Sequence, residues 1–136
     1  MSSELWNTFH DGSITAIQKT GSSQLVIAVD ISYLRNMFNN WGKGFIVTLE
    51  SVTLCEYQSF SENQWIDDIE QIVVAEPEIL SCINSEQSIL ITCENGLLRF
   101  KYETFSLTLD TGEPISYGEL KSLSTRYWQE FENRIS

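Results

Sequence analysis

The stretch Trp6-Asn7-Thr8-Phe9-His10-Asp11-Gly12-Ser13-Ile14 organises the rest of the chain. It contains the only histidine, and Leu5 and Phe9 stand four positions apart, which predicts a single helical turn with one buried side. Asp11-Gly12 is typical of a tight turn, because glycine tolerates a positive φ and aspartate can bond the backbone that follows it. We therefore expect a short helical lead-in, a turn and then the first strand of a sheet.

Length and composition predict one domain, residues 1–136. A chain of 136 residues has the size of a single domain, and its 42% of hydrophobic residues argues against disorder. No apolar run reaches the ~18 residues of a transmembrane helix. The N-terminus lacks the basic and apolar regions of a signal peptide, so the cytoplasm is the expected location.

Two neighbouring strands are expected after the first turn. The first runs from about Ile14 to Lys19, and the segment 20–23 joins it to the second as a hairpin around Gly21. Four apolar residues share one face of the second strand: Leu25, Ile27, Val29 and Ile31. Such alternation of mostly β-branched residues is typical of a half-buried strand.

A short helix and a β-rich segment follow. Residues 32–38 carry apolar side chains at helical spacing and predict a helix of about two turns. Residues 44–58 are predicted to form sheet, but the alternation of their apolar positions changes phase at Ser51. A phase change inside a β-rich segment indicates a bulge or a tight turn.

The segment from 61 to 77 supports two interpretations. Ser61 and Gln64 have the spacing of a capping box, and apolar residues continue at helical spacing, which predicts a short helix over 62–71. The β-branched residues of 69–75 would equally suit a strand. Pro77 closes the segment in either case.

Hairpins are expected in the next segment. Residues 79–83 and 88–93 are predicted to pair across a turn at 84–87. Asn95-Gly96 suits a type I′ turn that starts another strand. The inward residues of that strand and, after a break in phase at 103–104, of the next one are Leu98, Phe100, Tyr102, Phe105, Leu107 and Leu109.

A helix is expected at the C-terminus. Ser116 and Glu119 form a capping box, and an apolar stripe behind them is wide enough to pack on a sheet. The stripe consists of Tyr117, Leu120, Leu123, Tyr127, Trp128 and Phe131. The sequence thus predicts an α+β fold: an antiparallel sheet of about six to eight strands, the C-terminal helix packed on one face, and one or two short helices.

No pattern in the chain indicates a reaction. A His-Asp pair can bind a metal in phosphohydrolases, but such sites need further histidines, and His10 is the only one. The chain has no Gly-x-Ser-x-Gly elbow and no glycine-rich phosphate loop, and Asp67, Asp68 and Glu70 lack the spacing of a calcium loop. We therefore expect no catalytic residue, metal or cofactor, and we interpret His10 and Asp11 as residues that bond neighbouring backbone.

The three cysteines do not suggest a reactive site. Cys55, Cys82 and Cys93 are most simply small buried residues of a protein in a reducing compartment. Cys82 and Cys93 could also face each other across neighbouring strands and form a disulfide in an exported protein.

The charge is strongly negative and unevenly spread. A net charge of −11 argues against binding to nucleic acid, whose phosphates need clustered Lys and Arg, and against an anionic membrane surface. Residues 44–98 contain ten acidic residues and no Lys or Arg. Six of the acids fall in a single short segment: Glu62, Asp67, Asp68, Glu70, Glu76 and Glu78.

This acidic segment also supports two interpretations. It is either a solvated face that keeps the protein soluble, or a surface that steers and holds a protein partner with a basic surface. Trp65 lies within it, but a core position suits Trp65 better. Trp41, in a predicted loop, is the aromatic residue we expect to be exposed and to take part in partner binding.

The N-terminal motif resembles a short motif of small bacterial proteins, which carry Phe-His-Asp followed by Ala or Gly before their first strand. The residues that carry the resemblance are Trp6, Phe9, His10, Asp11 and Gly12. Some of these proteins are immunity proteins of polymorphic toxin systems. The resemblance covers about 30 of the 136 residues, and Gly12-Ser13 stands where related proteins more often have alanine and an acid.

The resemblance implies an acidic, non-enzymatic protein that binds and blocks one cognate toxin, with His10 and Asp11 as framework residues and the acidic surface as the recognition site. The leading hypothesis is therefore a binding protein, in particular an immunity-type inhibitor of a basic toxin domain. A structural or regulatory protein-interaction module is the second hypothesis. A carboxylate-based hydrolase is the third, because nothing singles out two of the many carboxylates.

Overall fold

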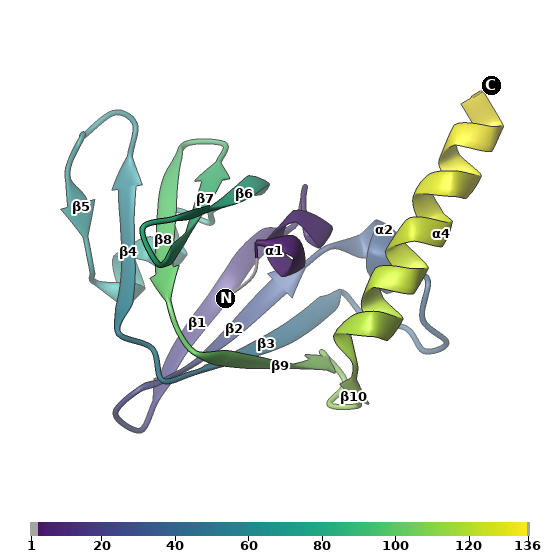
Figure 1. Ribbon diagram of the computed structural model, residues 1–136, viewed down its shortest axis with the longest axis horizontal. Helices are drawn as coiled ribbons and strands as arrows, with labels where there is room; N and C mark the ends of the chain where they lie inside the picture. The colour runs from purple at the N-terminus through teal and green to yellow at the C-terminus, as the bar shows by residue number, and fades with distance from the viewer. Residues whose placement is uncertain (1–2, 136) are drawn as a thin grey trace.

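The computed structural model describes residues 3–135, which form an α+β fold with two antiparallel sheets of five strands each (Figure 1). The strands of the first sheet lie in the order β1 (Ser13–Thr20), β2 (Gln24–Asp30), β3 (Gly44–Glu50), β9 (Thr104–Leu109) and β10 (Pro114–Ile115). Those of the second sheet lie in the order β5 (Trp65–Ile66), β4 (Leu54–Ser59), β8 (Gly96–Lys101), β7 (Ser88–Cys93) and β6 (Ile79–Ser85). The described residues also form the helices α1 (Glu4–Thr8), α2 (Ser32–Arg35), α3 (Ile69–Val74) and α4 (Tyr117–Ile135).

The prediction of one sheet with six to eight strands is wrong because the chain turns a corner. Strand β3 leads into β4 through Ser51, and β8 leads into β9 through Tyr102 and Glu103. The Glu103 backbone N–H donates to the Glu50 carbonyl oxygen at 3.0 Å, so both bends lie at one place. Ser51 has a φ of 55°, which no extended strand allows. The changes of phase in the sequence therefore mark a passage between two sheets (Figure 1).

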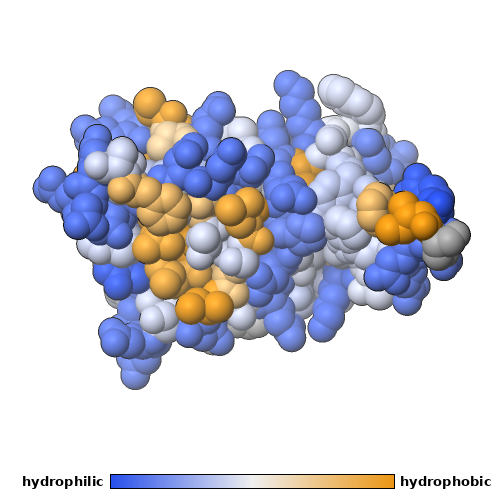
Figure 2. All heavy atoms as spheres, turned by 90° about the horizontal axis from the view of Figure 1, so that it is seen from above, coloured by the Kyte–Doolittle hydropathy of each residue, from blue (hydrophilic) through white to orange (hydrophobic). Residues whose placement is uncertain are grey.

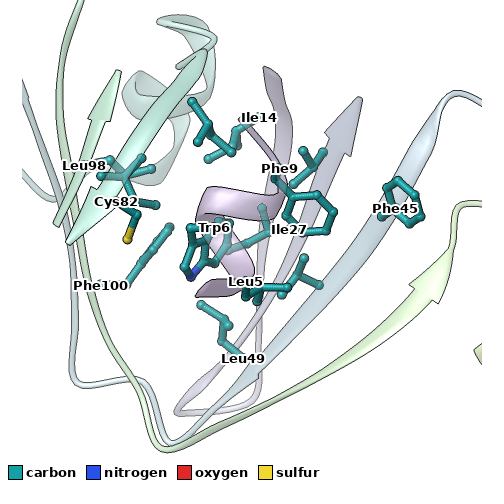
Figure 3. Packing of buried hydrophobic residues seen from close by; sticks show 14 of the residues in the cluster. Leu5, Trp6, Phe9, Ile14, Ile27, Phe45, Leu49, Cys82, Leu98 and Phe100 are labelled. Carbon is teal, nitrogen blue, oxygen red and sulfur yellow. The ribbon is translucent and has the colours of Figure 1, made fainter. Parts of the chain in front are cut away.

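Helix α1 and its C-cap residue Phe9 fill the space between the sheets (Figure 3). The buried Trp6 ring lies 5.4 Å from the Phe100 ring on the second sheet, and its indole N–H donates to the Tyr102 hydroxyl at 3.1 Å. The buried Phe9 ring lies 5.4 Å from the Phe45 ring on the first sheet. A short N-terminal segment thus supplies each sheet with a large aromatic side chain, and both sheets share one core cluster.

The same N-terminal segment covers the free edge of β6. The Asn7 side-chain amide donates to the Cys82 carbonyl oxygen at 2.9 Å and accepts the Cys82 N–H at 2.8 Å, as a neighbouring strand would. Further along the edge, the Asp11 N–H donates to the Ile79 carbonyl oxygen, and the Ile79 N–H donates to Gly12. These bonds satisfy N–H and C=O groups of the β6 edge, which could otherwise pair with a strand of another chain.

The turns of the second sheet differ in part from expectation. Glu86 and Gln87 connect β6 to β7 with φ values of 47° and 66°, as a type I′ turn requires. The prediction of a type I′ turn at Asn95-Gly96 is wrong, because Gly96 already pairs with Cys93 as part of β8. A Cβ on Gly96 would collide with the Tyr57 ring, so this glycine is needed for close packing.

Of the helix predicted over 62–71, only residues 69–71 are helical, as the first part of α3. Residues 65–66 form β5, and α3 begins after Asp68, whose side chain accepts the Glu70 N–H at 3.0 Å. Ser61, the predicted cap, bonds the Ser59 side chain instead. The alternative of a strand over 69–75 is wrong as well. A helix over 69–74 directs Ile72 into the core, where it is fully buried.

Helix α4 begins as predicted but does not cover a sheet face. The Glu119 N–H donates to the Ser116 hydroxyl at 3.0 Å, as in a capping box. The helix packs against α1 and α2, Leu120 is its one buried residue, and its C-terminal part runs past α2 away from the sheets (Figure 1). Its stripe is mostly aromatic, and it meets the aromatic side chains of the N-terminal motif and of α2. No helix within residues 3–135 has the length and apolar character that crossing a membrane requires.

Candidate functional site

The turn at Asp11-Gly12 is formed, but not in the way the sequence suggested. Asp11 adopts the positive φ, at 69°, and Gly12 is buried. A Cβ on Gly12 would lie 2.9 Å from both the Phe9 carbonyl oxygen and Val29 Cγ1. Gly12 is therefore needed because it has no side chain, while Asp11, a residue type that tolerates the left-handed region, makes the turn.

His10 joins the N-terminal motif to α4. Its ring stacks on Trp128 at 5.0 Å between centroids, and its Nδ1 lies 3.3 Å from an Asp11 carboxylate oxygen. Its carbonyl oxygen accepts the Tyr33 hydroxyl at 2.9 Å. Within residues 3–135 no three His, Cys, Asp or Glu side chains are grouped so that they could hold a metal ion. These contacts give His10 a role in holding α4 and α2 against the N-terminal segment.

The cysteine side chains are free thiols. Cys82 faces Ile91 across the β6–β7 ladder and Cys93 faces Ile79, so the two are not direct cross-strand partners. Burial raises the pKa of Cys55, Cys82 and Cys93 to about 12. At neutral pH the thiolate, which is the nucleophilic form, is therefore disfavoured at all three.

Five of the six predicted partner-binding acids lie exposed around α3, and we call them the acidic face: Glu62, Asp67, Asp68, Glu70 and Glu76. In the described part of the chain, the carboxylates that pair with Lys or Arg are those of Glu4, Glu56, Asp110 and Glu130. The acidic face therefore has no Lys or Arg partner within 4.0 Å among residues 3–135. Asp68 has a second role as the N-cap of α3.

Hydrophobic side chains lie among these carboxylates. Val74 is 83% exposed and lies one helical turn after Glu70, on the same side of α3. Val74, Ile66 and Glu62 line a shallow hollow of about 370 Å³ between the β4–β5 hairpin and α3. Phe60, 57% exposed, lies in the loop of that hairpin. Figure 2 shows hydrophobic residues gathered over the half of the molecule that the second sheet occupies, with hydrophilic residues around them.

The sixth predicted acid, Glu78, lies elsewhere. It pairs with Ser13 in an isolated bridge where β6 meets the N-terminal segment. Burial raises the pKa of its carboxyl, as do the charge of Glu94, a hydrogen bond with Glu94 and the charge of Asp11. Glu78 therefore belongs to a junction of the fold and not to the acidic face.

Trp41 is 79% exposed, but it does not lie with the acidic face either. It stands in the loop between α2 and β3, on the side of the molecule where α4 lies (Figure 1). A hollow of about 430 Å³ beside it is lined by Asp11, Asp30, Tyr33 and Lys43 among others, and it shares no residue with the hollow at Val74. The sequence grouped Trp41 with the acids as candidate partner-binding residues, whereas in the structure Trp41 lines a hollow that contains none of the acidic face.

The loop around Trp41 is held by a buried arginine that sequence reasoning missed. Arg35 is fully buried; its Nε donates to Asp110 at 2.9 Å, its Nη1 to the Asn40 carbonyl oxygen at 2.8 Å and its Nη2 to the Asn40 side chain at 2.7 Å. The Lys43 N–H donates to the second Asp110 oxygen at 2.7 Å. Trp41 is thus presented on a loop that is fixed on both sides. The partners of Arg35 lie up to 75 positions away, and no local pattern signals them.

The environment of Asp110 favours its ionised form. Burial alone would raise the pKa of this carboxyl, but hydrogen bonds from the Lys43 N–H, the Arg35 side chain and the Gly44 N–H, together with the charge of Arg35, hold the pKa below its usual value. The ion pair with Arg35 is therefore kept at neutral pH.

No protein-family model, curated protein or solved structure matches this chain. The structure shows an α+β protein whose hollows at Val74 and at Trp41 are shallow and open to solvent. Any function has to be argued from these surfaces.

Proposed function

We propose that this chain is a non-enzymatic binding protein whose acidic face engages a basic surface of a partner protein. In its most specific form, the proposal is an immunity-type inhibitor that blocks a basic toxin domain. One observation carries it: five exposed carboxylates without a Lys or Arg partner in residues 3–135 lie in the same segment of the chain as hydrophobic side chains that are open to solvent.

The combination of charge and hydrophobic area supports binding rather than solubility alone. Solubility needs charges spread over the surface and favours no exposed apolar group among them. Here the exposed Val74 lines a hollow with Glu62 and lies one helical turn after Glu70, and the exposed Phe60 stands two residues before Glu62. An apolar centre with a polar rim is the usual anatomy of a protein interface.

The electrostatics point to a basic partner. Unpaired carboxylates attract cationic proteins over roughly the Debye length, about 8 Å at physiological salt, and so raise the association rate. The net charge of −11 adds to this attraction. We therefore expect fast, salt-sensitive association through the acidic face, followed by burial of Val74 and Phe60.

The test uses a panel of purified basic toxin domains of polymorphic toxin systems and measures association and dissociation rates and toxin activity. In the face variant, Glu62→Lys, Glu70→Lys and Glu76→Lys remove the negative charge; Asp68 is left intact because it caps α3. The matched control carries Glu103→Lys, Glu119→Lys and Glu132→Lys, which change the net charge equally at other exposed positions.

We expect one domain to be bound and blocked by the natural chain. The face variant should associate at least about tenfold more slowly, and the control variant should stay within about threefold. Equal losses of association rate in both variants would mean that the acidic face acts only through the net charge of the protein. Failure of every domain in the panel to bind the natural chain would overturn the proposal.

A further inference from the structure

The hollow beside Trp41 combines aromatic walls with carboxylates. Trp41 stands at its rim, Tyr33 forms part of its wall, and Asp11 and Asp30 contribute carboxylate groups. The Tyr33 hydroxyl donates to the His10 carbonyl oxygen, and the Tyr33 ring packs on the Tyr127 ring at 4.7 Å between centroids. Tyr33 therefore forms a fixed wall, and Trp41 is the aromatic residue left open to a ligand. Aromatic faces and carboxylates attract the same class of ligand, an organic cation.

The rim of the hollow is fixed before any ligand arrives. Arg35 holds Asn40 on one side of Trp41, and Asp110 holds the Lys43 N–H on the other. Gly42 follows Trp41 directly, and a Cβ there would collide with Arg35 and Asp110. An exposed tryptophan on such a loop loses little conformational freedom on binding, which is the condition for an efficient anchor.

The chain contains a filled counterpart of this arrangement. On the second sheet, the Arg99 guanidinium carbon lies 4.4 Å from the centroid of the Trp65 ring, and Arg99 Nε donates to Glu56 at 2.8 Å. There, the arginine lies over the tryptophan ring and also bonds the carboxylate. At Trp41 the tryptophan and the carboxylates are present, and within residues 3–135 no Arg or Lys pairs with Asp11 or Asp30.

We propose that the hollow formed by Trp41, Tyr33, Asp11 and Asp30 binds the guanidinium group of an arginine side chain on a partner protein. The guanidinium plane stacks on the Trp41 indole while its N–H groups donate to the two carboxylates. This site is separate from the acidic face and does not depend on it.

Arginine suits the hollow better than lysine does. A planar guanidinium can stack on a ring and direct several N–H donors to carboxylates at once, whereas an ammonium is compact and strongly hydrated. Lys43 also lines the hollow, and its ammonium limits the net negative charge there. Selectivity for arginine should therefore come from stacking and bond geometry.

The test is a titration of the full chain with N-acetyl-arginine amide, followed through the indole N–H resonances of its four tryptophans by NMR. N-acetyl-lysine amide is the matched probe. Trp65, which already carries Arg99, is an internal control. The variants are Trp41→Ala and Asp30→Asn, with Asp67→Asn on the acidic face as the control substitution.

We expect the Trp41 resonance to shift saturably with the arginine probe and the Trp65 resonance to stay in place. The lysine probe and Asp30→Asn should each weaken binding about threefold or more. With Trp41→Ala the remaining three indole resonances should not respond. Equal shifts with both probes, shifts at all four tryptophans, or unchanged binding in Asp30→Asn would overturn the proposal.

The charge-reversed face variant separates this inference from the proposed function. It should bind the arginine probe as the natural chain does, because none of its substitutions lies in the Trp41 hollow. If the probe binds and no toxin domain does, only the proposed function fails. If a toxin domain binds and the probe does not, only this inference fails.

Discussion

The Trp41 loop and the α3 region both expose hydrophobic side chains, but they are held in opposite ways. The loop is fixed by Arg35, a fully buried charge with bonds to Asp110 and Asn40. Helix α3 has six residues, of which only Ile72 is fully buried, and its acidic residues have no Lys or Arg partner among residues 3–135.

This difference separates two contributions to recognition. Free carboxylates act at a distance and mainly raise association rates, whereas a pre-organised aromatic side chain acts on contact and mainly slows dissociation. At the Trp41 loop, Arg35 and Asp110 pair with each other and hold the structure, whereas the carboxylates around α3 have no Lys or Arg partner among residues 3–135. The following substitutions test whether the two regions really differ in this way.

The largest expected effect is that of Arg35→Met. It removes the buried donor of Asp110 Oδ1 and of the Asn40 carbonyl oxygen, and leaves Asp110 only the backbone N–H groups of Lys43 and Gly44, so we expect a loss of about 3–5 kcal/mol in the free energy of unfolding. Urea denaturation measures it. The comparison is Arg99→Met on the surface of the second sheet, where the ion pair and the stacking on Trp65 together should contribute only about 1 kcal/mol. Equal losses in the two variants would mean that the Arg35 network does not fix the loop.

The next effect in size is that of Ile72→Ala. Ile72 anchors α3, and its truncation should cost about 2–4 kcal/mol through lost burial and the cavity left behind. Val74→Ala, at an 83% exposed position two residues later, should stay within about 0.5 kcal/mol. Hydrogen exchange of the α3 amides should rise in the first variant only. A similar cost for both would show that Val74 is packed, which would remove the apolar centre of the proposed interface.

Sequence patterns predicted those parts of the fold in which local and tertiary preferences agree. The alternation in β2 places Leu25, Ile27 and Val29 in the core without any information from elsewhere in the chain. At the corner, the sequence indicates the change of phase at Ser51. That the two bends meet is seen only in the hydrogen bond from the Glu103 N–H to the Glu50 carbonyl oxygen, which joins residues far apart in the sequence and which a local pattern does not contain.

Where several local signals compete, tertiary packing decides. Ser61 and Asp68 are both good N-caps, and a cap contributes only about 1 kcal/mol. Starting the helix at Ile69 buries Ile72, which is worth more, so Asp68 becomes the cap. The same distinction applies to the candidate site. The exposure of the acids could be predicted from the composition of their segment, whereas the separation of Trp41 from them depends on the topology of the fold.

The smallest effects are those of pH, and Asp110 and Glu78 should respond with opposite sign. The pKa of Asp110, which follows β9 and holds the Trp41 loop, is lowered in the folded protein, so it stabilises the fold above its unfolded pKa, and that contribution is lost as the pH falls through the folded pKa. The pKa of Glu78, at the junction of β6 with the N-terminal segment, is raised. Its favourable contribution is present below the unfolded pKa and is lost as the pH rises through the folded pKa.

Asp110→Asn should therefore destabilise the protein at neutral pH, and the difference from the natural chain should narrow in acid. Glu78→Gln should stabilise it at neutral pH, since it removes a carboxylate held beside Glu94 and Asp11, and this gain should vanish in acid. Urea denaturation across the acid range measures both differences. If both carboxylates proved stabilising at neutral pH, Glu78 would have to be paired with a cation. The contrast between Asp110, which Arg35 holds, and Glu78, which lies beside other carboxylates, would then no longer hold.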